Sequence, residues 1–198
     1  MTGYTICTTA PAEEPVTLNE AKLHLRLDTS PISAHPDDSL ITALIKTARR
    51  WCEGFQGRVY VTQSWDLYLD AFPDGDYIEI PMPPLQSIVS LSYKDSAGVT
   101  QTVSFVDPSG TVLTETDDYR ISSFRQPGRI YLRSEKSWPT TLDESDAVWI
   151  SFVSGYGLAA DVPDEVKTAI LLKLSDLYEN RGDQEAPARY EMAAEALF

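Results

Sequence analysis

The stretch of sequence that decides the fold is residues 37–70, which read DDSLITALIKTARRWCEGFQGRVYVTQSWDLYLD. Its first half has apolar residues at three- and four-residue spacing, which predicts an amphipathic helix that begins at Asp37 or Asp38 and ends by Gly57. Residues 59–70 then alternate apolar and polar side chains, which predicts a strand with one buried face. The hydrophobic period therefore changes near Gly57, and we place the boundary between a helical and a β-module there.

Helical patterns lie on both sides of the β-module. Thr17 followed by Glu20 fits a capping box, and the helix that it opens continues to Leu27. Helical periodicity returns over residues 163–181, and a short last helix is expected over residues 187–197. The N- and C-terminal helices are therefore expected to form one helical bundle, although about 130 residues separate them.

Short strands with turn residues between them fill the middle of the chain. Their regular spacing predicts a compact antiparallel β-sandwich or barrel-like module. The predicted fold is thus α+β, with N-terminal helices in 1–57, an inserted β-module in 58–154, and C-terminal helices with a docking tail in 155–198. The strands that follow the first one are expected at 77–80, 88–93, 99–105, 119–122, 129–132 and 148–153.

The composition excludes several classes of protein. Of the 198 residues, 42% are hydrophobic, which is ordinary for a folded globular protein. The chain has sixteen basic and thirty acidic residues and therefore a net charge of −14. Surfaces that bind nucleic acids are built from clustered lysine and arginine, so this balance argues against a nucleic-acid-binding protein. No apolar run approaches the ~20 residues that span a bilayer, and residues 1–10 lack a secretory signal pattern. We expect no membrane association and folding in the cytosol.

The candidate catalytic and metal-binding residues all have simpler explanations. His24 and His35 have no cysteine or carboxylate at metal spacing nearby. The acid pair Asp37-Asp38 fits helix capping, and the pair at 117–118 fits a solvated turn. No phosphate-binding loop or nucleophile elbow is present. We therefore predict that the protein is not an enzyme and has no catalytic, cofactor-binding or metal-binding residues.

Four stretches together resemble a known family: Pro15–Leu27, Asp37–Trp65, Pro84–Tyr93 and Val148–Arg181. In their order and spacing they resemble the head–tail connector (adaptor, or head-completion) proteins of tailed bacteriophages, in particular the longer members with an inserted β-module. Similar parts occur in prophages and gene transfer agents, and the sequence does not separate these sources. Residues 105–138 match nothing in the family, so their role stays open.

The resemblance implies a structural part of the virion neck. Such proteins form rings, commonly twelvefold, beneath the portal protein, and they extend the DNA channel toward the next neck or tail-completion protein. The implied partners are the portal, that next component and further copies of the chain. DNA would pass through the channel without specific binding, and assembly would take place in the bacterial host cytoplasm.

The resemblance also implies that the C-terminal region docks on the portal. A helix as short as 187–197 is marginal in water, which suits a segment that orders when it binds. The alternative is an ordinary terminal helix that folds back on the body. The expected docking residues are Arg189, Tyr190, Met192, Ala193, Ala196, Leu197 and Phe198.

Two other functions compete with the connector. One is a monomeric module that binds a glycan or protein through exposed aromatic residues of the β-module such as Tyr60 and Tyr68. The other is an acidic hydrolase, which needs paired carboxylates about 5–10 Å apart in a concave site.

Overall fold

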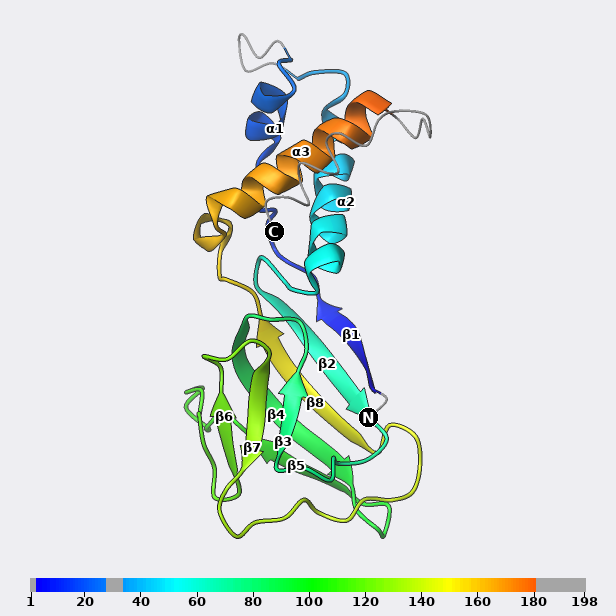
Figure 1. Cartoon of the computed structure of the whole chain (residues 1–198), viewed down its shortest axis with the longest axis vertical. Helices are drawn as coiled ribbons and strands as arrows, with labels where there is room; N and C mark the ends of the chain where they lie inside the picture. Colours follow the sequence, from blue (N-terminus) through cyan, green and yellow to red (C-terminus); the bar gives the residue numbers. More distant parts are fainter. Residues whose placement is uncertain (1–2, 28–33, 181–198) are drawn as a thin grey trace. The chain divides into compact units, whose positions relative to one another are not determined.

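The computed structural model describes residues 3–27 and 34–180, which contain three α-helices, one short 3₁₀ helix and eight strands (Figure 1). The mixed α+β class predicted from the sequence is confirmed. The helices are α1 (Leu18–His24), α2 (Asp38–Gln56), η1 (Ala159–Asp161) and α3 (Asp164–Asn180). The strands are β1 (Gly3–Thr9), β2 (Gln63–Leu69), β3 (Tyr77–Ile80), β4 (Leu85–Lys94), β5 (Thr100–Ser104), β6 (Tyr119–Ser122), β7 (Gly128–Leu132) and β8 (Val148–Ser154).

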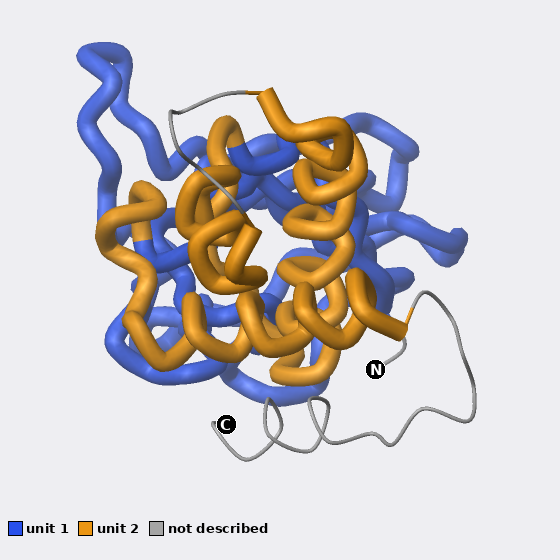
Figure 2. The backbone as a smooth tube through the Cα atoms, turned by 90° about the horizontal axis from the view of Figure 1, so that it is seen from above, with its two compact units in different colours: residues 1–11, 62–156 blue, residues 12–61, 157–198 orange. Residues whose placement is uncertain are grey.

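The chain divides into two compact units, which Figure 2 shows in different colours. One, here called the β-unit, consists of residues 1–11 and 62–156. The other, the helical unit, consists of residues 12–61 and 157–198. The sequence analysis had assigned residues 1–57 as a whole to the N-terminal helices. That assignment is wrong at the start of the chain, because β1 pairs antiparallel with β2 and belongs to the β-unit.

The β-unit contains two antiparallel sheets (Figure 1). The larger has five strands in the order β1-β2-β8-β4-β5, and the smaller has three in the order β3-β7-β6. The central strand β8 pairs with β2 on one side, in register from Val148 to Ser154, and with β4 on the other, where the register shifts twice. Strand β8, the last strand before α3, therefore lies between β2 and β4 in the sheet.

The two sheets share one hydrophobic core. Alternate residues of β3 and β8 point inward, and in β8 every second residue is buried from Val148 onward. Burial in this core raises the pKa of Tyr119 to about 12. Trp138 stacks on Phe72 with ring centroids 4.9 Å apart and donates its Nε1–H to the carbonyl of Gly75 at 2.7 Å. The buried core residues are Leu67, Leu69, Ile78, Ile80, Leu85, Ile88, Leu91, Phe105, Tyr119, Ile130, Val148, Ile150 and Phe152.

The prediction for residues 59–70 is right for β2 and wrong for the residues before it. The strand begins at Gln63, and Val59, Tyr60 and Val61 are all buried in the helical unit. Tyr60 was expected to be an exposed aromatic residue of the β-module. Its ring is fully buried instead, and its hydroxyl donates a 2.8 Å hydrogen bond to Gln56.

The capping box predicted at the start of α1 is present. The backbone N–H of Glu20 donates to the Thr17 hydroxyl at 3.2 Å, and the Glu20 carboxylate accepts the backbone N–H of Thr17 at 2.7 Å. These hydrogen bonds to Thr17 lower the pKa of Glu20. At the start of α2, Asp37 occupies the cap position, but its carboxylate accepts the hydroxyl of Tyr178 at 2.7 Å rather than a backbone N–H of its own helix. Gly57 ends α2 in the left-handed conformation, as predicted.

Helices α2 and α3 pack against each other through their apolar faces. Polar contacts also join them, because the Lys173 ammonium lies 4.5 Å from the centre of the Trp51 ring and Tyr178 reaches Asp37. Arg49 is buried on α2, where its guanidinium binds Glu14 at 2.7 Å and Glu53 at 2.5 Å. The buried apolar residues of the two helices are Ile41, Ile45, Ala48, Cys52, Val166, Ala169, Ile170 and Leu174.

Neither cysteine forms a disulfide, Cys7 being exposed and Cys52 buried. Cys52 is fully buried in the packing of α2, and this burial raises the pKa of its thiol to about 12. Among the described residues, no helix is both long enough and apolar enough to cross a membrane.

Replacing Ile170 with aspartate tests the packing of α3. Ile170 is fully buried, and its burial is worth about 1.5–3 kcal/mol before the cost of an unpaired buried charge. We expect Ile170→Asp to lower the free energy of unfolding by at least about 3 kcal/mol in urea denaturation. Ala43→Asp, at an exposed position of α2, serves as the control and should cost less than about 1 kcal/mol. Equal effects of the two variants would contradict the packing.

Candidate docking surfaces

The docking residues predicted from the sequence, Arg189 to Phe198, lie outside the described residues. A site can therefore be sought only in residues 3–27 and 34–180. Within these, no group of three or more histidine, cysteine, aspartate or glutamate side chains could hold a metal ion.

The side chains considered as possible catalytic or metal-binding groups have structural contacts. Asp38 forms an ion pair of 2.8 Å with the buried Lys22, and its pKa is lowered by this contact. The Nδ1 atom of His35 accepts the backbone N–H of Asp37 at 3.1 Å. Asp118 pairs with Lys136 at 2.6 Å. These contacts give Asp38 a role at a helix start and Asp118 a role in a loop.

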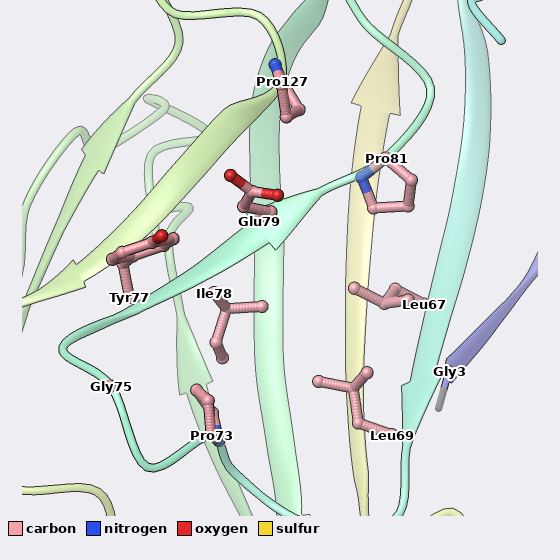
Figure 3. A pocket seen from close by; sticks show the side chains of 10 residues that line it. All are labelled: Gly3, Leu67, Leu69, Pro73, Gly75, Tyr77, Ile78, Glu79, Pro81 and Pro127. Carbon is pink, nitrogen blue, oxygen red and sulfur yellow. The ribbon is translucent and has the colours of Figure 1, made fainter. Parts of the chain in front are cut away.

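An apolar hollow of about 550 Å³ opens on the β-unit between β2 and β3. Figure 3 shows Leu67 and Leu69 of β2 on one side and Ile78 of β3 on the other. Its acidic lining residue, Glu79, forms an ion pair of 2.6 Å with Arg129. The hollow offers apolar surface and proline rings, without the paired carboxylates that a hydrolase needs. The remaining lining residues are Gly3, Pro73, Gly75, Tyr77, Pro81 and Pro127.

A second surface lies on the outer side of the three-stranded sheet. Residues 119–133 contain four arginines and no aspartate or glutamate, in a chain with a net charge of −14. Because the alternate residues Tyr119, Ile121, Ile130 and Leu132 pack on the core, the residues between them point outward. We call this surface the basic face, and it consists of Tyr77, Arg120, Phe124, Arg125, Arg129, Tyr131 and Arg133. Glu79 and Glu115 lie on the same surface as the ion-pair partners of Arg129 and Arg133.

Tyr131 lies at the centre of the basic face. The guanidinium groups of Arg125 and Arg129 each donate to its hydroxyl at 3.4 Å. The hydrogen bond from Arg129 is the main cause that lowers the pKa of Tyr131, and Arg125 adds to it. Arg129 also lies 4.1 Å from the centre of the Tyr77 ring. Arg129 is already paired with Glu79, so Arg125 is the guanidinium beside this phenol that has no ion pair among the described residues.

The basic face is hollowed and has an exposed aromatic ring beside it. The hollow has a volume of about 810 Å³, and Arg120, Arg125 and Arg133 line it. Arg133 pairs with Glu115 at 3.4 Å, whereas Arg120 and Arg125 form no ion pair within the described part of the chain. Phe124, between β6 and β7, is 100% exposed. An arginine-lined hollow beside a bare phenyl ring is a typical surface for a protein partner.

A third surface lies on the outer side of β1 and β2, and it has the opposite charge. We call it the acidic face. The rings of Tyr4 and Tyr68 stack with centroids 5.2 Å apart, and the Tyr4 hydroxyl donates to Asp146 at 3.0 Å. The hydrogen bond to Asp146 raises the pKa of Tyr4. Three aspartates belong to this face, Asp66, Asp70 and Asp146, and none of them forms an ion pair with lysine or arginine among the described residues. The acidic face consists of Tyr4, Ile6, Asp66, Tyr68, Asp70 and Asp146.

Comparison with known proteins identifies the class of fold. No protein-family model matches the chain, and no curated protein matches it. Solved structures do match. A chain in the neck of an empty gene transfer agent (GTA) particle, computed with C6 symmetry, has a TM-score of 0.77 at 22% sequence identity, over 98% of this chain and 94% of that chain.

Two further matches come from the native particle. One is a chain in the virion of the native gene transfer agent particle, with a TM-score of 0.75 and 21% identity. The other is a chain in the neck of the native particle computed with C12 symmetry, with a TM-score of 0.72 and 20% identity. Both matches cover 98% of this chain and 94% of the other. The chain therefore has the fold of a neck protein of phage-like particles, and the resemblance stated from the sequence is confirmed at the level of the fold.

The sequence analysis missed both charged faces. Residues 105–138 were left without a role, although the acid-free run of arginines at 119–133 was visible in the sequence. The acidic face could not have been found in the same way. Its residues come from three separate parts of the chain, and β1 was not predicted as a strand.

The titration of Tyr131 tests the geometry of the basic face. We expect its phenol to ionise below the ordinary value of 10, because two guanidinium groups stabilise the phenolate, and Tyr4 to ionise above it. In ¹³C NMR of ring-labelled tyrosine, Arg129→Met should raise the pKa of Tyr131 and leave that of Tyr4 unchanged. Arg50→Met, at an exposed position of the helical unit, is the control. A Tyr131 pKa that does not respond to Arg129 would contradict the described contacts.

Proposed function

We propose that this protein is a structural head–tail connector (adaptor) of a phage-like particle. In this proposal, copies of the chain form a ring, twelvefold as is common in the resembled family, beneath the portal protein. The ring extends the DNA channel and joins the head to the next neck or tail-completion protein. It is assembled in the bacterial host cytoplasm and remains in the neck of the finished virion.

The observation that carries the proposal is the likeness of fold over nearly the whole of both chains. A TM-score of 0.77 over 98% of this chain and 94% of the other leaves no large part of either chain without a counterpart. The matching chains are components of symmetric particles, two of which were computed as necks with C6 and C12 symmetry. In the proposal, α1, α2 and α3 are the helical bundle of the connector, and the β-unit is its sandwich-like insert.

The charge of the chain agrees with a channel protein. With a net charge of −14, any acidic surface that faces the channel would repel the phosphates of passing DNA. Such repulsion lets DNA slide without being held. A protein that grips DNA needs the opposite balance of charge.

The competing function, a monomeric module that binds through exposed aromatic residues, loses part of its support. Of the two residues on which it depended, Tyr60 is fully buried in the helical unit. Tyr68 stacks on Tyr4 and lies among the aspartates of the acidic face. Two of the most exposed aromatic residues of the β-unit, Tyr4 and Phe124, belong to the charged faces.

Deleting residues 186–198 tests the docking of the connector. The predicted docking residues in this segment supply more apolar surface than a solvated tail needs, so their loss should remove the contact with the portal. We expect the shortened chain to keep its melting temperature and to fail in pull-down with the portal protein. Cells that produce the particle should then release DNA-filled heads without tails, counted by electron microscopy.

A pair of substitutions supplies the matched comparison. Leu197→Ser with Phe198→Ser removes apolar surface and should reproduce the deletion, whereas Glu191→Gln with Glu195→Gln keeps that surface and should allow tails to join. A shortened chain that still joins heads to tails at normal yield would overturn the docking role of these residues.

A further inference from the structure

We propose that the basic face of one copy binds the acidic face of the next, and that this contact joins the copies into a ring. The inference rests on the proposed function, since it names the surfaces through which a connector of this kind would assemble. The partner is thus a second copy of the same chain.

The two faces point in different directions on the same compact unit. The inner sides of the five-stranded and three-stranded sheets share one core. The outer side of β6 and β7 and the outer side of β1 and β2 therefore face away from each other. A contact between two such unlike faces is heterologous, which means that each copy uses one face toward each neighbour. Repetition of this contact produces a ring when the rotation closes.

The charges of the two faces are complementary; the three aspartates accept hydrogen bonds from Ser151, the Asp146 backbone and Tyr4, but no cation neutralises them within the described residues. Arg120 and Arg125 form no ion pair within the described residues, and neither do Asp66, Asp70 or Asp146 with any lysine or arginine there. Copies with a net charge of −14 repel one another at a distance, but salt screens this repulsion over ~8 Å. At contact, the local attraction between arginines and aspartates outweighs the screened repulsion and sets the orientation of the partner.

Apolar groups accompany the charges on both faces. Phe124 is fully exposed beside the arginines, while Tyr4 and Ile6 on the acidic face are 50% and 46% exposed. Buried aromatic and arginine side chains carry most of the binding energy in protein interfaces. Strand β1 is also an edge strand of its sheet, so its outer backbone groups are accessible to a neighbour. The hollow of about 810 Å³ on the basic face has room for side chains from such an edge.

A charge-reversal exchange tests this contact in the full-length chain. The first variant, Arg120→Glu with Arg125→Glu, reverses the basic face, and the second, Asp66→Lys with Asp70→Lys, reverses the acidic face. Each alone places like charges at every contact. An equimolar mixture can alternate the two variants, so that every contact again joins opposite charges. The control, Lys46→Glu with Arg50→Glu, makes the same change of charge as the first variant at exposed positions of α2.

Two readouts follow assembly: sedimentation velocity of the free chain at high concentration, and ring formation on the purified portal by electron microscopy. We expect the wild type and the control to assemble in at least one of the two readouts. There, each face variant alone should associate at least about tenfold more weakly than the wild type, and the equimolar mixture should recover the association. Circular dichroism first shows that the variants are folded. Face variants that assemble like the wild type, or folded variants whose mixture does not recover, would overturn the inference.

The remaining outcomes separate this inference from the proposed function. A wild-type chain that binds the portal only as single copies overturns the face-to-face contact and leaves the portal contact standing. Association that depends on both faces, without any binding to the portal, supports the inference and overturns the connector role. The basic face could instead bind duplex DNA. In that case a gel-shift assay would show that the wild type binds DNA and that the first variant does not, while both assemble equally well. That outcome would overturn the inference.

Discussion

The pairing of β2 with β8 is the constraint on which the rest of the structure depends. Gln63 lies opposite Ser154 in this pair, and just outside it Val61 forms a bridge with Gly157. The chain therefore leaves the helical unit and returns to it at neighbouring positions. Because of this, α3 can pack on α2 although a whole β-unit separates them in sequence. The same pair lies next to β1 and β4, so it also fixes the order of the five-stranded sheet.

Periodicity in the sequence predicted the elements that have one buried and one exposed side. Helix α2 and strands β3 and β6 lie where the pattern predicted them, because the spacing of their apolar residues in the sequence matches the spacing of their buried positions. Strand β1 was missed because it is an edge strand whose residues are almost all exposed, so burial imposes no alternation on it. Tyr60 was misplaced for the opposite reason. Val59, Tyr60 and Val61 are three consecutive buried residues. In the sequence, a tyrosine between two valines fits the alternation of a half-buried strand equally well, so the pattern does not reveal that all three are buried.

The candidate sites were less predictable than the fold. The docking residues chosen from the sequence lie outside the described residues, and the surfaces that the structure reveals were not among them. The basic face depends on which arginines of 119–133 point outward, and that is decided by the packing of Tyr119 and Ile130 on the core. The acidic face depends on strand pairing that brings Tyr4 to Tyr68. A net charge of −14 describes the whole chain and conceals this separation of charge between two sides of one unit.

The measurement that tests the account most directly is the structure of the neck in purified particles, determined by electron cryomicroscopy from cells that produce this protein. We predict a closed ring of this chain in contact with the portal on one side and with a neck or tail component on the other. In that ring, the arginines of 119–133 would lie against β1 and β2 of the adjacent copy. A neck without this chain, or single copies of it attached to the outside of the particle, would contradict the central claim.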